Sequence, residues 1–407
     1  MEIGITPGIT LDITHLAAGG DGIGRASDGR VVLCEGALPG ERVEATVVLE
    51  RRDFLRARTV AVLQASPDRR DPACPHVAEG CGGCTWPYVR AGETEASLKA
   101  AIVGDALRRI AHLPDAVVGT APITVSDVAY RTTVRLVVDA HGRAAYRRRH
   151  GHDTVASDSC LVAHPLLEEL IVKGRFAGAG GVLLRVGVAG GERLVCPDRR
   201  GARVTVPPGT VVARVGDRRA RIHEEVAGRR WRVSAASFFQ SGPAAAEALA
   251  RAVADAAGGV VGPGGRIVDL YAGVGVLGGA LAAATGAAQL VAVESSAEAA
   301  DDAAHNLADL DARVVRAEVV ATAGRLGPSP DLVIADPART GLGPSAAAAV
   351  ASLRAPVVVL VSCDPASLAR DAALLDGHGY TLDRVEVVDA FPSTFHVETV
   401  SRFSATR

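Results

Sequence analysis

The sequence predicts an α/β protein with a doubly wound, mostly parallel sheet in its C-terminal half, a small N-terminal β-barrel, and a central α+β region between them. From about residue 244, short apolar segments alternate with alanine-rich stretches that are long enough for helices. That alternation is typical of a doubly wound sheet. Several short strand-like segments fall within residues 1–63, and a stretch rich in proline, glycine and cysteine follows at residues 66–90.

The N-terminal region has the pattern of a small barrel. Its strand-like segments are residues 8–13, 30–33, 42–49 and 57–63. Glycine-containing turns separate them, as expected where strands end at tight turns. Several strands in about sixty residues favour a barrel such as an OB-fold, which often binds oligonucleotides. A generic all-β module without that function is the alternative.

The C-terminal region carries the repeated strands of the sheet. They are predicted at residues 266–270, 289–294, 313–316, 331–335, 356–361 and 382–388, with a last strand at 397–403. A helical pattern covers residues 94–110. Between about 119 and 235, strand-like and turn-like segments alternate.

Composition limits the class of protein. The chain has 407 residues, enough for two or three domains, and 48% of them are hydrophobic, enough for a sizeable core. The formal net charge of −2 excludes a globally basic surface, so nucleic-acid binding would depend on local patches. No apolar run reaches the ~20 residues of a membrane span, and residues 1–12 lack the features of a secretory signal. The expected location is the cytoplasm, where the seven cysteines should stay reduced.

A glycine turn follows the first strand of the predicted sheet, at residues 269–275. Gly273 and Gly275 allow the backbone to approach a ligand closely at a strand-to-helix turn. Glu294 ends the next strand, where a carboxylate can accept hydrogen bonds from ribose hydroxyls. Together with Asp336, which follows a later strand, these residues favour S-adenosylmethionine over NAD. The alternative is an ordinary tight turn in an α/β domain.

A second group of residues lies at strand ends nearer to the C-terminus. Arg339 follows Asp336-Pro337, where enzymes that methylate amino groups place an aromatic residue, and this argues against N-methylation. Cys363 follows a buried strand and precedes a turn at Pro365. A nucleophile is expected at this ligand-binding edge of a parallel sheet. A small buried cysteine without a chemical role is the alternative.

A thiolate at this edge suits the methylation of a pyrimidine at C5. C5 of uracil is a poor nucleophile, but addition of a thiolate to C6 makes an enolate that is nucleophilic at C5. A base must then remove the C5 proton before the thiolate can leave. Glu398 is the predicted base. His396 is the competing candidate, since alternation along a strand places residues 396 and 398 on one face.

Four cysteines form a candidate metal site. Cys74, Cys81 and Cys84 lie close together in the sequence, and Cys160 lies farther along the chain. Four thiolates can bind a [4Fe–4S] cluster or a structural Zn²⁺. The spacing leaves both alternatives open.

These motifs together resemble the RNA uracil-C5 methyltransferase family, in particular its iron–sulfur branch that methylates 23S ribosomal RNA. The similarity covers nearly the whole chain. Its segments are the TRAM-like residues 22–25 and 37–41, the four cysteines, Phe238-Phe239-Gln240, residues 269–275, Glu294, Asp336, Ser362-Cys363-Asp364-Pro365 and residues 391–399. The last two motifs, in this order near the C-terminus, are the most specific.

The resemblance implies a domain organisation and a set of functional residues. It implies a TRAM barrel at residues 1–63, a central iron–sulfur and RNA-binding domain at residues 64–90 and 119–234, and a class I, Rossmann-like methyltransferase domain at residues 91–118 and 235–407. The implied nucleophile is Cys363 and the implied base is Glu398. The implied S-adenosylmethionine site consists of Gln240, Asp269, Tyr271, Gly273, Gly275, Glu294 and Asp336. The implied ligands of a [4Fe–4S] cluster are Cys74, Cys81, Cys84 and Cys160.

The expected partner is RNA, with ribosomal RNA favoured over transfer RNA, and the protein is expected to act as a monomer away from membranes. Arg131, Arg147, Arg148 and Arg149 are the predicted phosphate contacts, with a solvated charged face as the alternative. The same chemistry on the T-loop uridine of tRNA is a second hypothesis. A third is an RNA-binding homologue without activity. Cytosine-C5 methylation also uses a thiolate at C6, but the motif around Glu398 argues against it.

The sequence departs from the family pattern at four positions. Asp364 replaces the usual asparagine, Ala338 replaces a proline, Ala272 replaces a cysteine, and Ser241 occupies the region of another usual asparagine. None of these changes removes a catalytic group. A carboxylate at Asp364 would raise the pKa of the neighbouring thiol if both were buried.

Overall fold

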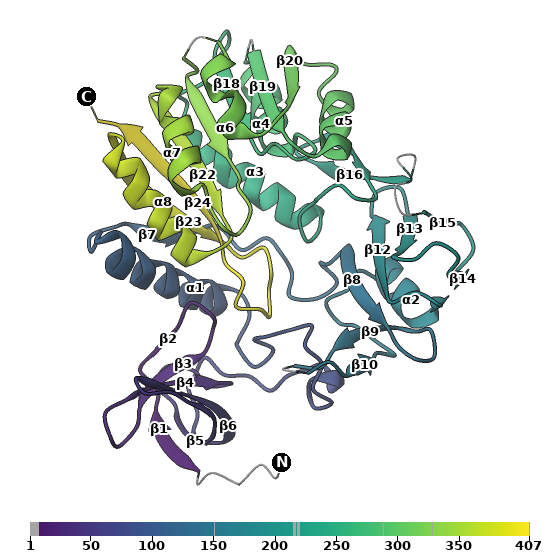
Figure 1. Cartoon of the computed structure of the whole chain (residues 1–407), viewed down its shortest axis with the longest axis vertical. Helices are drawn as coiled ribbons and strands as arrows, with labels where there is room; N and C mark the ends of the chain where they lie inside the picture. The colour runs from purple at the N-terminus through teal and green to yellow at the C-terminus, as the bar shows by residue number, and fades with distance from the viewer. Residues whose placement is uncertain are drawn as a thin grey trace.

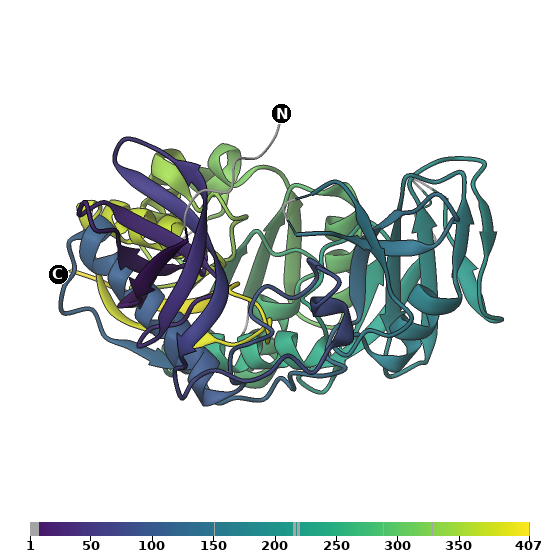
Figure 2. The same cartoon turned by 90° about the horizontal axis from the view of Figure 1, so that it is seen from below.

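The computed structural model describes residues 8–149, 151–214, 217, 220–287, 289–327 and 329–406. Residues 1–7 of the predicted barrel and the C-terminal Arg407 lie outside the described part. Figure 1 shows three parts, with the N-terminal sheet at the lower left, the α/β sheet above it, and the central sheets on the right. Seen from below, the N-terminal and central parts lie toward opposite ends of the molecule (Figure 2).

The N-terminal part is a curled six-stranded sheet with the order β1-β5-β6-β4-β3-β2. Its strands are β1 (Ile9–Asp12), β2 (His15–Leu16), β3 (Gly22–Arg25), β4 (Val31–Glu35), β5 (Arg42–Glu50) and β6 (Phe54–Gln64). Alternate residues of β3 and β4 are buried, because a strand presents successive side chains to opposite faces. The inward side chains, among them Leu11, Val32 and Val43, form a separate small core. The predicted N-terminal β module is therefore confirmed.

The central part is built around a six-stranded sheet with the order β10-β9-β8-β12-β13-β15. Its strands are β8 (Thr133–Val138), β9 (Ala144–Arg147), β10 (Thr154–Ala156), β12 (Gly181–Gly187), β13 (Glu192–Pro197) and β15 (Thr210–Val212). Around it lie the short helix η1 (Pro75–Val77), helix α2 (Pro165–Lys173), the pair β11 (Arg175–Ala177) and β14 (Arg203–Thr205), and the hairpin of β16 (Arg221–Val226) and β17 (Arg229–Ser234).

The C-terminal part is an eight-stranded sheet with the order β20-β19-β18-β21-β22-β24-β23-β7. Its strands are β18 (Arg266–Leu270), β19 (Gln289–Glu294), β20 (Ala312–Arg316), β21 (Leu332–Ala335), β22 (Val357–Ser362), β23 (Tyr380–Val388), β24 (Glu398–Ala405) and, from far upstream, β7 (Val118–Thr120). The helices around it are α3 (Pro243–Ala257), α4 (Val276–Thr285), α5 (Ala297–Asn306), α6 (Val319–Thr322), η3 (Ala323–Arg325), α7 (Gly343–Ser352) and α8 (Pro365–Gly377).

The predicted doubly wound sheet is confirmed, with strands at all seven predicted positions. β18 and β19 have the predicted bounds of 266–270 and 289–294. The last strand, β24, inserts between β22 and β23 and runs antiparallel to both. The rest of the β18–β22 sheet is parallel. This insertion brings the C-terminal end of the chain next to β22.

The upstream helix joins the C-terminal part. α1 (Glu93–Ala106) continues as a π-helical turn, Leu107–Ala111, so the predicted helix at 94–110 changes its hydrogen bonding in its last turn. Val103 and Leu107 are fully buried in one cluster with Leu368 and Tyr380 of the C-terminal part. The helix therefore packs on the α/β sheet although about 130 residues, most of them in the central part, separate it from α3 in the sequence.

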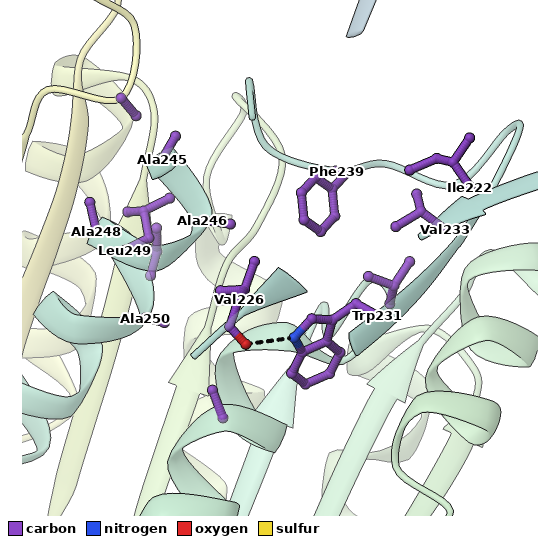
Figure 3. Close-up of a cluster of buried hydrophobic side chains, with 14 of the residues drawn as sticks. Ile222, Val226, Trp231, Val233, Phe239, Ala245, Ala246, Ala248, Leu249 and Ala250 are labelled. Carbon is purple, nitrogen blue, oxygen red and sulfur yellow. Dashed lines mark hydrogen bonds between the residues drawn. The ribbon is translucent and has the colours of Figure 1, made fainter. Parts of the chain in front are cut away.

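A hydrophobic core connects the β16–β17 hairpin to the C-terminal part. Trp231 is completely buried and its indole N–H donates to the carbonyl of Val226 at 3.0 Å. Figure 3 shows Trp231 below Phe239, with the alanine-rich face of α3 beside them. Burial of an indole of this size stabilises a fold by several kcal/mol, on the order of 3–5. This core therefore gives the segment that follows β17 a fixed support.

Among the residues that the structure describes, no helix combines the length and the apolar character needed to cross a bilayer.

Candidate active site

The two strands β22 and β24 bring Cys363 and Glu398 together. In their antiparallel register Ser362 pairs with Thr399. The residue after Ser362 is Cys363 and the residue before Thr399 is Glu398, so the same register makes these two neighbours. Opposing residues of antiparallel strands have Cα atoms about 5 Å apart. The topology therefore places the predicted nucleophile beside the predicted base.

A cavity of about 720 Å³ opens at this edge of the sheet. It is lined by eight of the predicted catalytic and cofactor residues: Gln240, Asp269, Tyr271, Gly273, Glu294, Asp336, Cys363 and Glu398. Gly275 is not among the lining residues. Its φ of 92° lets the chain turn into α4 next to Leu307, so its place is in the support of the turn. The structure thus gathers residues from five strand ends around one space.

The Cys363 thiol lies in a half-buried, acidic environment. Burial, Glu398 and Asp336 together raise its pKa to about 11, although Arg339 acts in the opposite direction. The neighbouring Asp364 has a different task, because its carboxylate accepts the backbone N–H of Ser367 at 2.7 Å and caps α8. The departure at Asp364 is therefore accommodated as a helix cap, and the pKa of the thiol is raised mainly by burial, Glu398 and Asp336.

Glu398 is a buried carboxyl group, with 6% of its surface exposed. Burial raises its pKa well above the ordinary value, and Asp336 adds to this, while Arg339 and Lys99 act in the opposite direction. Glu398 is therefore not a carboxylate of the solvent-exposed surface. A carboxylate with a raised pKa is a stronger base once it is ionised, which suits the removal of a proton from carbon.

His396 differs from Glu398 in its hydrogen bonding. Its Nδ1 lies 3.0 Å from Nη2 of Arg339. Because a guanidinium can only donate, Nδ1 accepts, and the ring proton of the neutral imidazole sits on Nε2. Burial, Arg339 and Arg131 lower the pKa of His396 to about 4. The lone pair of His396 is therefore already used, which favours Glu398 as the base.

The glycine turn after β18 forms a cradle at the cavity wall. Tyr271 and Gly273 both have positive φ values, 62° and 56°. Glu294 fixes this turn, because its Oε2 accepts the N–H of Gly273 at 2.9 Å. A Cβ at Gly278 would lie 2.6 Å from Oδ2 of Asp269, so only glycine leaves room for that carboxylate.

Asp269 is a buried carboxyl group with one free acceptor. Its Oδ2 accepts the N–H of Gly278 at 3.0 Å, whereas Oδ1 is buried without a protein partner. Burial, together with the nearby Asp336 and Glu294, raises its pKa to about 7, although the bond to Gly278 acts in the opposite direction. A buried acceptor without a partner is costly. Asp269 also lines the large cavity.

The segment that carries Gln240 is held by two buried charges. Asp302 accepts from Oγ of Ser234 at 2.9 Å and from Oγ of Ser237 at 2.7 Å. Arg185 donates to the backbone carbonyls of the same two serines, at 2.7 and 2.8 Å. Oε1 of Gln240 is buried without a partner. This clamp therefore fixes the segment from which Gln240 lines the cavity.

The four predicted metal ligands also converge. Cys74, Cys81, Cys84 and Cys160 line one small cavity of about 70 Å³, and none of them forms a disulfide. Within the described part of the chain, however, no three His, Cys, Asp or Glu side chains are close enough to hold a metal ion. This arrangement supports neither the zinc nor the [4Fe–4S] alternative over the other. Gly83 lines this cavity and the larger one, so the two spaces are adjacent.

The arginines predicted to contact phosphate have different environments. Arg149 donates to the carbonyl of Cys84 at 2.6 Å and therefore supports the cysteine loop. Arg131 lines the large cavity, beside the ring of Phe391 at 6.0 Å. Arg147 and Arg148 are exposed. The predicted surface patch is thereby reduced to these last two residues.

The comparisons with known proteins agree with this architecture. Residues 9–60 match the TRAM domain. A protein of Streptomyces avermitilis described as an uncharacterized RNA methyltransferase is 35% identical, and the alignment covers 96% of each chain. One of Corynebacterium efficiens with the same description is 34% identical, over 97% of this chain and 94% of the relative. The chain belongs to this family of RNA methyltransferases.

A solved structure resembles the methyltransferase over its full length. It is the Pyrococcus abyssi tRNA (uracil-54, C5)-methyltransferase in complex with S-adenosyl-L-homocysteine, which is 22% identical. The alignment covers 97% of this chain and 100% of that one, with a TM-score of 0.69. The two proteins therefore share the fold, including the curled N-terminal sheet predicted as a TRAM barrel.

Part of the cavity wall of this methyltransferase was not predicted from its sequence. Gly82, Gly83 and Thr85 line the cavity, so the cysteine loop borders the candidate active site directly. The Cys81-Gly-Gly-Cys84 spacing predicted a metal ligand loop and gave no sign of this second contact. The one sequence signal for close packing at this loop is the Gly82-Gly83 pair. A Cβ at Gly82 would lie 2.7 Å from the carbonyl of Arg147, so the loop approaches its neighbours too closely for a side chain there.

Proposed function

We propose that this methyltransferase transfers a methyl group from S-adenosylmethionine to C5 of a uridine in RNA, with Cys363 as the nucleophile and Glu398 as the base. The observation that carries the proposal is the register of β22 and β24, which makes the two residues neighbours at the wall of one cavity. The shared fold with a uracil-C5 methyltransferase supports the same reaction.

The acidic side of the cavity suits S-adenosylmethionine. That molecule carries a sulfonium cation, an ammonium group and two ribose hydroxyls, and it supplies the methyl group as an electrophile. Asp269 and Gln240 both line this space, and each has one buried acceptor without a protein partner. Glu294, at the end of β19, holds the glycine turn from the same wall. These residues can accept hydrogen bonds from the donors of the cofactor.

Cys363 and Glu398 divide the chemistry between them. The Cys363 thiolate adds to C6 of uracil, and the electron pair of the C5–C6 bond becomes an enolate. C5 of the enolate takes the methyl group and the sulfonium leaves as a neutral thioether. The Glu398 carboxylate removes the remaining proton from C5, and the electron pair expels the thiolate from C6. The product is 5-methyluridine, and both protein groups return to their starting state apart from the proton on Glu398.

Arg339 and His396 stand next to this pair. The Arg339 guanidinium lowers the pKa of both Cys363 and Glu398, so it favours the anionic forms that the reaction needs. His396 presents a neutral ring whose proton lies on Nε2, because Nδ1 accepts from Arg339. It can therefore donate a hydrogen bond to a carbonyl of the base.

For the four cysteines we propose a [4Fe–4S] cluster. The proposal is supported by their convergence on one small cavity and by the absence of disulfides among them. Such a cluster spreads its cysteine sulfurs around a cube, so it does not need the close packing of ligands around a single ion. Methyl transfer requires no electron transfer, so a structural role is expected.

For the substrate we propose ribosomal RNA, with transfer RNA as the competing substrate. The four cysteines resemble those of the iron–sulfur branch that methylates 23S ribosomal RNA, and this favours ribosomal RNA. The relatives are named only as RNA methyltransferases, whereas the similar Pyrococcus abyssi enzyme is named for tRNA. The exposed Arg147 and Arg148 border the cysteine loop and are available for phosphate contacts.

The test is direct. Purified protein is incubated with labelled S-adenosylmethionine and unmodified rRNA or tRNA, and the methylated nucleoside is identified by mass spectrometry. 5-Methyluridine in one of the two RNAs would establish reaction and substrate together. Methylation by a Cys363→Ala variant at the parental rate would refute the covalent mechanism. No product in either RNA, from protein with an intact metal site, would support a homologue that binds RNA without methylating it.

A further inference from the structure

A buried ion cluster connects helix α1 to the loop that precedes Glu398. This loop, residues 389–397, joins β23 to β24 and is called the 389–397 loop below. In Figure 1 it is the yellow segment that descends from the α/β sheet toward the other two parts. It contains His396 and is followed directly by Glu398, the first residue of β24, so its conformation determines where the predicted base lies.

Lys99 of α1 is the centre of this cluster. Its side chain is completely buried, as is that of Glu95, and that of Asp389 is 2% exposed. Nζ of Lys99 contacts Oδ1 of Asp389 at 2.6 Å, Oε1 of Glu95 at 2.9 Å and the carbonyl of Phe391 at 3.1 Å. The three N–H donors of the ammonium therefore have three acceptors, and two of them belong to the 389–397 loop.

Glu95 extends the same contact further along the loop. Its Oε2 accepts the backbone N–H of Ser393 at 3.0 Å, and its Oε1 accepts that of Thr394 at 3.3 Å. The hydroxyl of Thr394 donates to the carbonyl of Phe391 at 2.8 Å and accepts the N–H of His396 at 3.3 Å. One turn of α1 thus fixes the backbone of this loop from Asp389 to His396.

The charge of Lys99 also reaches the predicted catalytic groups. It lowers the pKa of Glu398 and contributes to the low pKa of His396. The other ionisable groups that act on Glu398 are Asp336, which raises its pKa, and Arg339, which lowers it. Cys363 faces it from the end of β22.

We propose that Lys99 is a positioning residue for the reaction: it holds the 389–397 loop in the conformation that presents Glu398 to the cavity. Lys99 does not line the cavity and acts through the loop. The effect on catalysis rests on the proposed function, whereas the effect of Lys99 on the conformation of the loop does not. A buried ion cluster by itself is weak evidence of a stabilising role, since apolar replacement is often neutral. The geometry that singles out Lys99 is its third bond, to a loop carbonyl.

The experiment uses the full-length protein with Lys99→Met, which keeps the aliphatic stem and removes the ammonium. Lys173→Met is the matched control, because Lys173 is exposed and only paired with Glu169 on the same helix. Hydrogen exchange followed by mass spectrometry measures the amides of the 389–397 loop. Faster exchange in this loop is expected for Lys99→Met alone. Unchanged exchange in a folded Lys99→Met protein would overturn the proposal, whether or not the protein proves to methylate uridine.

The kinetic measurement separates positioning from mere stabilisation. For Lys99→Met, kcat should fall roughly 10- to 100-fold with little change in KM, as expected when a base is displaced by a fraction of an ångström to an ångström. The acidic limb of the pH–rate profile should move to higher pH, because the positive charge that lowers the pKa of Glu398 is gone. An unchanged kcat and profile would leave Lys99 with no catalytic effect and refute the idea.

A second variant controls for the case in which Lys99→Met does not fold. Removal of the ammonium alone leaves two buried carboxyl groups unpaired, which can unfold the protein. The triple variant Glu95→Gln, Lys99→Met, Asp389→Asn keeps the shapes and removes all three charges. It should fold, should still exchange faster in the 389–397 loop because the bond to the Phe391 carbonyl is lost, and should have a reduced kcat. Parental exchange and kcat in this variant would show that the cluster only stabilises the fold.

Discussion

Asp269→Asn should stabilise the ligand-free protein at alkaline pH while weakening its binding of S-adenosylmethionine. Asp269 is completely buried, with Oδ2 bonded to the N–H of Gly278 and Oδ1 without a partner. An asparagine has the same shape and can keep the bond to Gly278 through its carbonyl. It removes a negative charge from a place where burial and two neighbouring carboxyl groups disfavour one.

The magnitude follows from the pKa. Folding raises the pKa of Asp269 from 3.8 to about 7. Each pKa unit corresponds to about 1.4 kcal/mol, so ionised Asp269 costs the ligand-free fold up to about 4 kcal/mol above pH 7. The amide of the asparagine leaves one buried donor without a partner, at a cost of about 1–3 kcal/mol. The net gain in the free energy of unfolding at pH 8 is therefore about 2 kcal/mol.

The sign of the pH dependence is fixed by the direction of the shift. The folded state binds a proton at Asp269 that the unfolded state has lost between about pH 4 and pH 7, so the contribution of Asp269 to stability falls as the pH rises through this window. Asp336, with a pKa also raised to about 7 by burial, behaves in the same way. Comparing variant and parent at each pH isolates the effect of Asp269.

The assay is thermal unfolding of ligand-free parent and Asp269→Asn protein at pH 5 and pH 8. We expect the melting temperature of the C-terminal part to rise by roughly 5 °C at pH 8, taking 2–4 °C per kcal/mol, and no gain at pH 5. S-adenosylmethionine should raise the melting temperature of the parent more than that of the variant. A variant that is equally stabilised at both pH values, or less stable at pH 8, would refute the reasoning.

Four further predictions address the reaction and the metal site. Glu398→Gln should accumulate a covalent RNA–protein adduct that survives denaturing gel electrophoresis, since the C5 proton cannot be removed, whereas the double variant with Cys363→Ala should form none; an adduct in the double variant would exclude Cys363 as the attachment point. For the parent, log(kcat/KM) should increase with pH from about 7 to 9. The pKa of the Cys363 thiol is about 11, so the fraction of thiolate grows through this range. A flat profile would argue against rate-limiting attack by the thiolate. Gly278→Ala should weaken the binding of S-adenosylmethionine, measured by calorimetry, because the new Cβ would lie 2.6 Å from Oδ2 of Asp269 and displace that carboxylate. An unchanged affinity would show that the carboxylate can move without loss of binding. Cys84→Ser should lower the iron content after anaerobic reconstitution and destabilise the protein, with Cys34→Ser as a buried control outside the set; equal iron in both would remove Cys84 from the ligand set.

Local patterns predicted much of the fold. β18 and β19 were predicted at their observed bounds because each is a short apolar run between turn residues, a signal that a strand carries within itself. The positions of Cys363 and Glu398 at strand ends followed from the same patterns. Their adjacency did not follow, because it depends on the insertion of β24 between β22 and β23. Strand order is set by contacts across the sheet, which leave no local trace in the sequence.

The least predictable residues are those that act across long distances in the chain. Lys99 was one more residue of a helical pattern, although it bonds to Asp389, 290 positions away. Thr85 was part of a candidate metal loop, although its hydroxyl accepts the N–H of Phe395, 310 positions away. Asp364 appeared as a charge beside the nucleophile, and the structure uses it as a helix cap. In each case a tertiary partner decides the role of the side chain.

The contacts of the 389–397 loop have a consequence for biosynthesis. The loop is held by hydrogen bonds to Lys99, Glu95, Thr85 and Arg70, which span 290 to 323 residues of chain. The N-terminal segments leave the ribosome and fold first, and the closure of such long loops is entropically slow. The predicted nucleophile, Cys363, and the predicted base, Glu398, are therefore held together only after almost the entire chain has been made and residues 70–99 have docked on the 389–397 loop. A chain that ends before β24 contains the cysteine loop and the glycine turn but lacks Glu398, so the paired Cys363–Glu398 arrangement cannot form in it.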